Sequence, residues 1–370
     1  MTLADLVTNG DGTGHRIVET GGEPTTVRRP YLVRRRFDGW LLGGLAITAW
    51  ALMAGLPALG VELPGFRGPV LWALLAATAT HFAVSYHLAY GPGRDHIAAH
   101  RLALVIVPSL LLFGVLAVTI AVFFDVEAVS YRGPQAGLVA VYSLTTWHFV
   151  KQTYGVMRAA AALTRVTISD RMARALRYGL YPMWLADAAT VWTSGYQAND
   201  YGFDASYSVL PSSTVEILEL VSLGSAVVVV GALVAIGLRS RRLPPSVWTP
   251  YGSAILWIVF QPDHLSALLV FGAAHALQYL AFAHRAEVEW ARHESHPQPV
   301  LRWCGVFGGA LAAGMMATYW LPMWLGYADG RQLGVTLAAL VFVVLNLHHY
   351  AVDAVIWRSR GAHTQRIIGH

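Results

Sequence analysis

Histidines recur at one depth in the apolar stretches of this chain. Six of the fifteen histidines lie inside such stretches, and four of the stretches are predicted to end near residues 90, 157, 284 and 357. Counting back nine residues from each end reaches His81, His148, His275 and His348, and His349 follows directly. Nine residues of α-helix span roughly 13 Å, so four helices are expected to present imidazoles in one layer. A histidine inside a membrane is costly without a partner, which favours a shared metal or cofactor site.

The donor type narrows the choice of metal. Neutral imidazole suits iron, copper, zinc and nickel, whereas calcium and magnesium prefer carboxylate-rich sites. The adjacent His348 and His349 point about 100° apart on a helix, so one of the two is expected to face a shared metal and the other to be structural. The alternative is a set of core histidines that bond to neighbouring helices without any metal.

Two polar residues lie one helical turn from these histidines. Asp353 follows His349 at i+4 and therefore shares its face, where it is expected to orient an imidazole or bind the metal directly. Tyr279 follows His275 at the same spacing and is expected to position a substrate or an oxygen-derived intermediate. Both residues are therefore candidates for a catalytic role beside the predicted metal ligands.

A third candidate is the only lysine in a chain with 26 basic residues. Lys151 lies in an apolar stretch, three residues after His148, and is also expected to position the substrate. Asp187 in the next stretch is a potential counter-charge for this lysine. The alternative is a purely structural ion pair between the two, or a lysine that extends its ammonium to the membrane interface.

The segments that would position these residues are predicted to be transmembrane helices. Hydrophobic residues make up 55% of the 370 residues and charged residues 13%, and the mean hydropathy is +0.48. A helix of about 20 apolar residues crosses the hydrocarbon core of a bilayer. The composition therefore predicts an all-α, polytopic membrane protein with about ten transmembrane helices. Their expected ranges are 38–60, 68–90, 102–124, 136–157, 178–195, 213–238, 247–261, 263–284, 303–325 and 332–357.

The distribution of arginine predicts the orientation of these helices. Most arginines fall in alternate short loops, as expected for the cytoplasmic side, and this places both termini in the cytoplasm. The same pattern explains the net charge of +5 without a nucleic-acid partner, so none is expected. We predict a flexible cytoplasmic tail over 1–36, a single transmembrane domain over 37–358 and a second cytoplasmic tail over 359–370, in a bacterial cytoplasmic membrane. The seventh range, 247–261, is short and carries Pro250, which makes it a candidate for a broken or re-entrant segment.

Two segments resemble membrane enzymes that bind non-haem iron through histidines on several helices. They are Trp147-His148-Phe149-Val150-Lys151-Gln152 and Asn346-Leu347-His348-His349-Tyr350-Ala351-Val352-Asp353. The family they resemble is that of the bacterial Brp/Blh-type carotene dioxygenases, whose helices carry a His-Phe pair and a late histidine followed by aspartate at i+4. Tyr279 occupies the place of a second histidine on one helix of that family, and ten spans exceed the number expected there. The resemblance implies a multi-histidine iron site rather than a carotene substrate.

Three functions are compatible with these patterns. The leading hypothesis is an oxidoreductase or oxygenase with non-haem iron, bound in the cytoplasmic half of the bilayer, acting on a lipophilic substrate from the bilayer and reduced by a cytoplasmic electron donor. Copper and zinc are alternative metals. The second hypothesis is a haem-binding cytochrome, and the third is a proton-coupled transporter. Phosphate-binding loops, nucleophile elbows and HExxH zinc-protease motifs do not occur in the sequence.

Overall fold

The protein is built almost entirely from helices. The computed structural model describes residues 31–62, 67–193, 199–200, 202–262, 267–293, 296–329 and 332–357. Apart from a short antiparallel pairing of β1 (Asn199–Asp200) with β2 (Phe203–Asp204), the regular elements in these ranges are helical, as predicted. The helices, with π-helical turns labelled η, are η1 (Trp40–Gly44), α2 (Leu45–Ala58), α3 (Gly68–Tyr90), α4 (Arg94–Ala99), η2 (Leu102–Ile106), α5 (Val107–Phe123), α6 (Glu127–Ser130), α7 (Arg132–Leu163), α8 (Asp170–Tyr178), α9 (Tyr181–Thr190), α10 (Ser212–Ser240), α11 (Pro245–Val259), α12 (Ala267–His293), α13 (Pro299–Met315), η3 (Met316–Trp320), α14 (Leu321–Asp329) and α15 (Gln332–Ile356).

Seven of the ten predicted ranges coincide with helices that are long and apolar enough to cross a membrane. These seven candidate spans are Trp40–Ala58, Gly68–Tyr90, Leu102–Phe123, Ser212–Ser240, Ala267–Arg292, Pro299–Leu325 and Leu333–Ile356. The other three ranges fall on α7, α9 and α11. The helix α7 has 32 residues but a more polar composition, while α9 and α11 have only 10 and 15 residues. The chain is therefore an all-α, membrane-type protein, and the predicted count of ten and the predicted orientation remain expectations.

Proline and glycine mark the beginnings and ends of several of these helices. Proline lies in the first turn of α3, α9, α11 and α13, where its fixed φ suits a helix and its missing N–H leaves no bond unmade. The helix α3 ends at the sequence Gly91-Pro92-Gly93, in which Gly93 has a positive φ of 94°. These signals fix where α3 stops, and hence how far His81 lies from its end.

The predicted tails lie mostly outside the described residues, which begin at 31 and end at 357. Of residues 31–36, assigned to the N-terminal tail, Leu32 is buried in the main core and Val33 packs against it, whereas Arg35 and Arg36 are exposed. The carboxylate of Asp38 accepts hydrogen bonds from the backbone N–H groups of Leu32, Val33 and Arg34, at 2.6, 3.0 and 3.2 Å. This short segment is therefore fastened to the start of the first helix rather than free.

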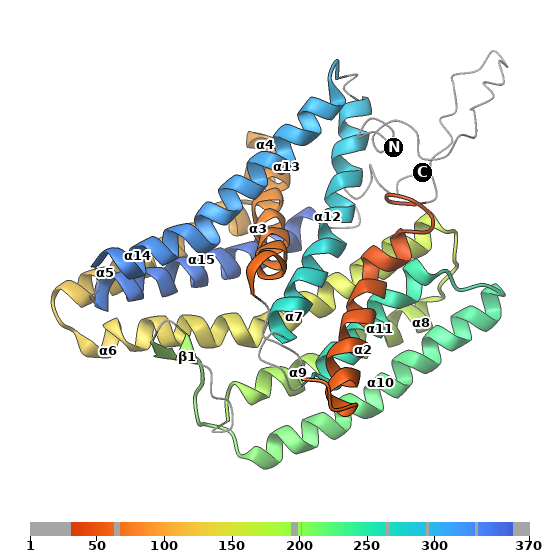
Figure 1. Ribbon diagram of the computed structural model, residues 1–370, viewed down its shortest axis with the longest axis horizontal. Helices are drawn as coiled ribbons and strands as arrows, with labels where there is room; N and C mark the ends of the chain where they lie inside the picture. Colours follow the sequence, from red (N-terminus) through yellow and green to blue (C-terminus); the bar gives the residue numbers. More distant parts are fainter. Residues whose placement is uncertain are drawn as a thin grey trace.

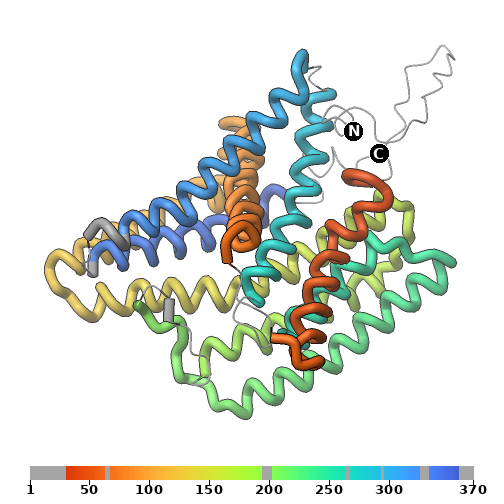
Figure 2. The backbone as a smooth tube through the Cα atoms, in the orientation of Figure 1, coloured from red at the N-terminus to blue at the C-terminus, as the bar shows by residue number. Residues whose placement is uncertain are grey.

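Four helices meet at the centre of the protein: α3, α7, α12 and α15. In Figures 1 and 2, α7 and α15 run beside each other, while α3 lies between α12 and α13. The contact between α3 and α13 is so close that a Cβ atom on Gly314 would lie 2.1 Å from the carbonyl oxygen of Ala79. The main core is formed by buried side chains of these central helices together with those of α8–α11. This packing brings residues 81, 148, 275 and 349 to one region.

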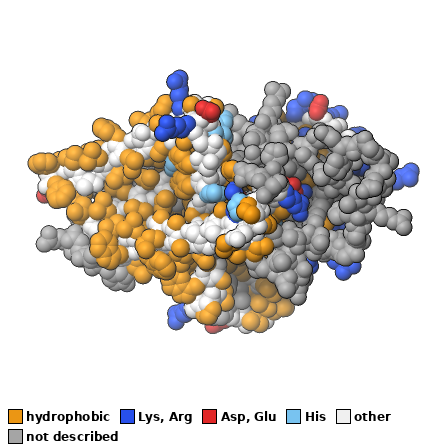
Figure 3. All heavy atoms as spheres, turned by 90° about the horizontal axis from the view of Figure 1, so that it is seen from above, with side chains coloured by type: hydrophobic (Ala, Val, Ile, Leu, Met, Phe, Trp, Pro, Cys, Tyr) orange, Lys and Arg blue, Asp and Glu red, His pale blue; other side chains and the backbone are white. Residues whose placement is uncertain are grey.

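The outer surface of the helices is apolar. Large exposed hydrophobic side chains are frequent on α5 and α10, for example Leu110, Phe113 and Leu220. In the described part of the face that Figure 3 shows, hydrophobic side chains outnumber charged ones. Such a surface suits the hydrocarbon of a bilayer rather than water.

Candidate metal centre

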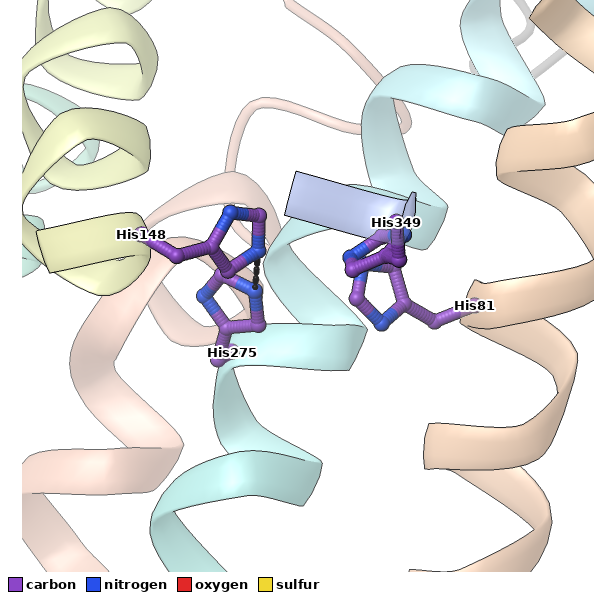
Figure 4. Close-up of side chains that lie close together, drawn as sticks. All are labelled: His81, His148, His275 and His349. Carbon is purple, nitrogen blue, oxygen red and sulfur yellow. Dashed lines mark hydrogen bonds between the residues drawn. The ribbon is translucent and has the colours of Figure 1, made fainter. Parts of the chain in front are cut away.

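The structure brings four of the predicted histidines together. His81 on α3, His148 on α7, His275 on α12 and His349 on α15 each offer one ring nitrogen, and these four nitrogens all lie within 4.8 Å of one another. All four side chains are buried, with exposed fractions of 2, 6, 5 and 1%. Figure 4 shows the rings converging from four helices as two pairs, His148 with His275 and His81 with His349. The group is compatible with a metal site.

The spacing of the nitrogens fits one ion after small ring movements. The Nε2 atoms of His148 and His275 are 3.0 Å apart, and these two rings lie edge to face with their centroids 4.8 Å apart. Metal–imidazole bonds are about 2.0–2.1 Å long, so two nitrogens on one ion lie about 3 to 4.2 Å apart, from adjacent to opposite positions. All separations in the group are within 4.8 Å, so none exceeds this range by more than about 0.6 Å, a difference that side-chain rotations can remove.

Ser85 contacts the ring nitrogen of His349 that points away from the cluster. The Oγ atom of Ser85 donates its proton to the carbonyl oxygen of Phe82 at 2.7 Å, and lies 2.9 Å from Nδ1 of His349. When this single proton is donated to Phe82, the hydroxyl accepts from the Nδ1–H of His349, and that tautomer leaves Nε2 with a lone pair. A histidine ligand usually donates its second ring N–H in this way. His349 is therefore prepared to ligate through Nε2.

Several buried polar atoms without a hydrogen-bond partner gather at this point. They are Nε2 of His81, Nε2 of His349, the hydroxyl of Tyr279 and Oδ1 of Asp353. Ser85 and Asp353 lie near the Tyr279 hydroxyl, but no neighbour meets hydrogen-bond geometry with it. An unsatisfied buried polar group costs about 1–3 kcal/mol, so four of them in one place indicate a site that a ligand completes.

Asp353 links the two pairs of histidines. Its Oδ2 atom lies 3.5 Å from Nε2 of His148 and 3.6 Å from Nε2 of His349, and the side chain is buried. The sequence predicted the pairing with His349 from the i+4 spacing, and the structure adds the contact with α7. A carboxylate beside these two Nε2 atoms can accept a hydrogen bond from one that carries a proton, or supply a further oxygen ligand to a shared ion.

A chain of amide side chains holds His275 in place. The side-chain nitrogen of Gln152 donates to the carbonyl oxygen of His275 at 2.9 Å and to Oε1 of Gln278 at 3.3 Å. The amide of Gln278 in turn donates to the carbonyl oxygen of Leu42 at 2.7 Å. These bonds connect α7, α12 and η1, so the backbone that carries His275 is fixed on two sides.

Aromatic rings surround the four imidazoles. Tyr350 stacks on His148 and Phe149 packs on His275, with ring centroids 4.8 and 4.3 Å apart. The remaining contacts are those of Phe82 with His349, at 4.6 Å, and of Tyr279 with His81, at 4.5 Å. A shell of this kind excludes water and fixes the ring orientations. The tight packing of Tyr279 agrees with its predicted place at the site.

Two other predicted residues do not join the group. His348 lies on a different face of α15 from His349, and its Nε2 atom is 3.3 Å from the hydroxyl of Tyr90. Lys151 is exposed, and its Nζ atom lies over the ring of Trp147, 5.1 Å from the centroid. The ammonium therefore belongs to the outer side of α7 and not to the histidine cluster.

Asp187, the predicted partner of Lys151, contacts a different residue. Asp187 on α9 accepts a short hydrogen bond from the hydroxyl of Thr146, and no ion pair joins it to Lys151 in the described part of the chain. The carboxylate holds α9 against α7 through Thr146. A structural ion pair between the lysine and this aspartate is thus not observed.

The sequence interpretation missed two residues at the centre. Ser85 follows His81 at i+4, the same spacing that identified Asp353, but a serine in a helix gives no distinctive signal. Tyr350 stacks on His148 and its hydroxyl is 2.9 Å from that of Thr145. Its neighbour on α7 lies 205 positions away in the chain, so only the fold reveals this contact.

Comparison with known proteins adds no assignment. No protein-family model, no curated protein and no solved structure matches this chain. The class of the protein is therefore given by its own structure: a helical membrane-type protein with a buried four-histidine cluster that is compatible with a metal ion.

Proposed function

We propose that this protein is an integral membrane oxidoreductase of the oxygenase type, with non-haem iron held by His81, His148, His275 and His349. The observation that carries the proposal is the convergence of four buried imidazole nitrogens within 4.8 Å of one another among apolar helices. The resemblance to the Brp/Blh-type dioxygenases points to the same metal and to the same kind of ligand set.

The donor set favours iron over zinc. Four imidazoles would close the tetrahedral shell of zinc, as in structural sites, whereas iron commonly takes further ligands and would keep open positions. Bound non-haem iron supplies one-electron and dioxygen chemistry, which the side chains of a protein cannot supply themselves. This donor set therefore fits a redox role of the metal better than a structural role.

The compact arrangement also favours non-haem iron over haem. Haem iron receives two axial ligands from the protein, because the porphyrin occupies the other four positions. Here four nitrogens converge within 4.8 Å, with Tyr350 and Phe149 packed against them, which leaves no space for a macrocycle between the rings. The haem-binding alternative would need this cluster to separate.

The residues around the histidines have distinct roles in this proposal. Ser85 lies against Nδ1 of His349, on the side of the ring away from the site, and Oδ2 of Asp353 lies beside the Nε2 atoms of His148 and His349, where it would supply a further oxygen ligand. The hydroxyl of Tyr279 and the carboxylate of Asp353 lie near each other without a hydrogen bond of good geometry, and in this proposal they hydrogen-bond a polar group of a substrate or a water. The aromatic shell excludes bulk water from a reactive site.

The substrate is proposed to be lipophilic and to enter from the bilayer. Phe149 and Tyr350 are each partly exposed and also pack directly on an imidazole, so each connects the helix surface with the site. Movement of these two rings would admit an apolar molecule. An electron donor on the cytoplasmic side completes the proposal.

Metal analysis of purified protein and matched variants tests the assignment. Protein in detergent is examined by mass spectrometry for metals, by visible absorption and by Mössbauer spectroscopy after growth with ⁵⁷Fe. We expect bound iron without the intense Soret band of haem, and loss of that iron in His81→Ala, His148→Ala and His275→Ala. The control is His296→Ala, because His296 lies in the turn before α13, outside the cluster.

The result that overturns the proposal is equally specific. Iron content that persists in the three cluster variants would remove the ligand assignment, and a Soret band would replace it with the haem-binding alternative. Folding of each variant is checked by its elution volume in size-exclusion chromatography and by its far-ultraviolet circular dichroism. Metal-free protein that retains its activity would favour the transporter hypothesis instead.

A further inference from the structure

A second pair of histidines lies in the connection between α3 and η2, away from the four-histidine cluster. His96 belongs to the short helix α4, and His100 follows it at i+4 as the residue that ends this helix. The backbone N–H of His100 donates to the carbonyl oxygen of His96 at 3.1 Å, so one closed helical turn separates the two side chains. Residues at this spacing share one face of a helix.

The two imidazoles have the geometry of the pairs inside the cluster. The ring centroids of His96 and His100 are 4.6 Å apart and the rings lie edge to face, at 64°. In the cluster, the centroids of His81 and His349 are 4.4 Å apart at 87°, and those of His148 and His275 are 4.8 Å apart at 67°. Rings at this separation can direct one nitrogen each to a common ion.

One nitrogen of this pair is buried and has no hydrogen-bond partner. It is Nε2 of His96, although the residue as a whole is only partly buried in a loop region. A polar atom that is shielded from water and still unpaired requires an explanation, and a bound ion is one of the usual ones. The cluster shows the same sign at His81 and His349.

The charge state of His96 suits metal binding. Burial and the neighbouring His100 together lower the pKa of the His96 imidazole below its ordinary value. A neutral imidazole is the form that ligates a metal.

We infer that His96 and His100 form a second metal site, for a divalent transition metal ion that completes its coordination with water. Two histidines at i and i+4 on one helical face are a recurring chelating pair, as in the two histidines of zinc-protease helices. Among the divalent ions, Cu²⁺ binds nitrogen donors most strongly and accepts a tetragonal arrangement of two imidazoles and waters. The site has fewer protein ligands than the cluster, so it holds its ion more weakly.

This site is independent of the proposed function, because it shares no residue with the cluster. It is tested with full-length protein purified without a polyhistidine tag, titrated with Cu²⁺ and followed by electron paramagnetic resonance. Wild-type protein is compared with His96→Gln, His100→Gln, the double variant and the control His296→Gln. The terminal histidines are present in all samples and contribute an equal background.

We expect the wild type and the control to bind one class of Cu²⁺ that each single variant loses. Its spectrum should carry hyperfine splitting from imidazole nitrogen. Because one ion needs both rings, the double variant should lose no more Cu²⁺ than either single variant. Copper uptake that is unchanged in both single variants, or losses that add in the double variant, would overturn the inference.

The outcome is distinguishable from failure of the cluster. Iron that is present after purification reports the cluster alone, and it should be unchanged in His96→Gln and His100→Gln. Protein that lacks iron but shows the Cu²⁺ class would refute the proposed function and support the second site. Protein that keeps iron but lacks the Cu²⁺ class would do the opposite.

Discussion

The helices α12 and α5 show how this protein divides its hydrophobic residues between its interior and its surface. The span that includes α5, Leu102–Phe123, is the most apolar of the seven candidate spans, yet only 11% of its apolar window is buried. The span of α12, Ala267–Arg292, is among the least apolar, and 61% of its window is buried. In a water-soluble protein the order would be reversed, because the most apolar helix would form the core.

The difference follows from the solvent. A helix that faces lipid needs apolar side chains on all sides, and side chains such as Leu112 and Phe113 on α5 have little else to contact. The helix α12 is surrounded by protein, so it can carry His275, Gln278 and Tyr279, for which neighbouring helices provide packing and polar partners. The comparison therefore predicts that chemistry is confined to the buried faces of the central helices.

The largest effect is expected for two adjacent histidines on α15. His349→Ala removes a buried nitrogen from the cluster, and we expect the bound metal to be lost. His348→Ala removes a ring that contacts Tyr86 and Tyr90 outside the cluster, and the metal should remain. Metal content per chain, measured by mass spectrometry, checks both. Equal metal loss in the two variants would mean that the face of α15 with His348 matters as much for metal binding as the face with His349.

A pair of glycines tests the packing side of the comparison. Gly314→Ala places a Cβ atom 2.1 Å from the carbonyl oxygen of Ala79, so α13 must move from α3 at a cost on the order of 2 kcal/mol or more. Gly114→Ala on α5 meets nothing within 4 Å and should be neutral or stabilising by up to about 1 kcal/mol. Thermal unfolding in detergent measures both. Similar melting temperatures would contradict the close approach of α3 and α13.

A smaller effect, on metal affinity, is expected from replacing a serine at the buried site but not from replacing one on the lipid-facing helix. Ser85→Ala removes the acceptor for Nδ1–H of His349, and loss of such a partner typically lowers metal affinity by about 10- to 100-fold. Ser109→Ala on α5 removes a hydroxyl that bonds only to its own helix, at the carbonyl oxygen of Val105, and should leave the affinity unchanged. Competition with a chelator of known affinity measures both constants. A Ser85→Ala protein with wild-type metal affinity would show that Ser85 does not set the tautomer of His349.

The sequence predicted which histidines meet better than it predicted how far they lie from the helix ends. The helices α7 and α12 end at Leu163 and His293, beyond the predicted ends at 157 and 284, so the common distance of nine residues from the helix end is not observed. Counting residues from the predicted ends nevertheless selected His81, His148 and His275, which do meet. It could not separate His348 from His349, because the rotation of α15 depends on its contacts with α3 and α7. Ser85 escaped notice for the same reason, since its importance lies in a bond to a residue 264 positions away.

Hydropathy predicted most, but not all, of the helices. Seven ranges agree with helices that are long and apolar enough to span, whereas 178–195 and 247–261 correspond to helices of only 10 and 15 residues. A short apolar run has the same composition whether it crosses a bilayer or packs inside a protein, and much of α11 is buried against its neighbours. Composition alone cannot distinguish these two cases, because it does not contain the contacts.

The smallest effect is expected for the lone lysine, and it sharpens the comparison on a central helix. The α7 helix has both a buried face, with His148, and an exposed face, with Lys151. Lys151→Gln removes an exposed cation that lies over Trp147, an interaction worth about 0.5–1 kcal/mol, and touches no residue of the cluster. Metal content should therefore equal that of the wild type, with a fall in melting temperature of no more than a few degrees. Loss of metal in this variant would show that the exposed face of α7 also belongs to the site.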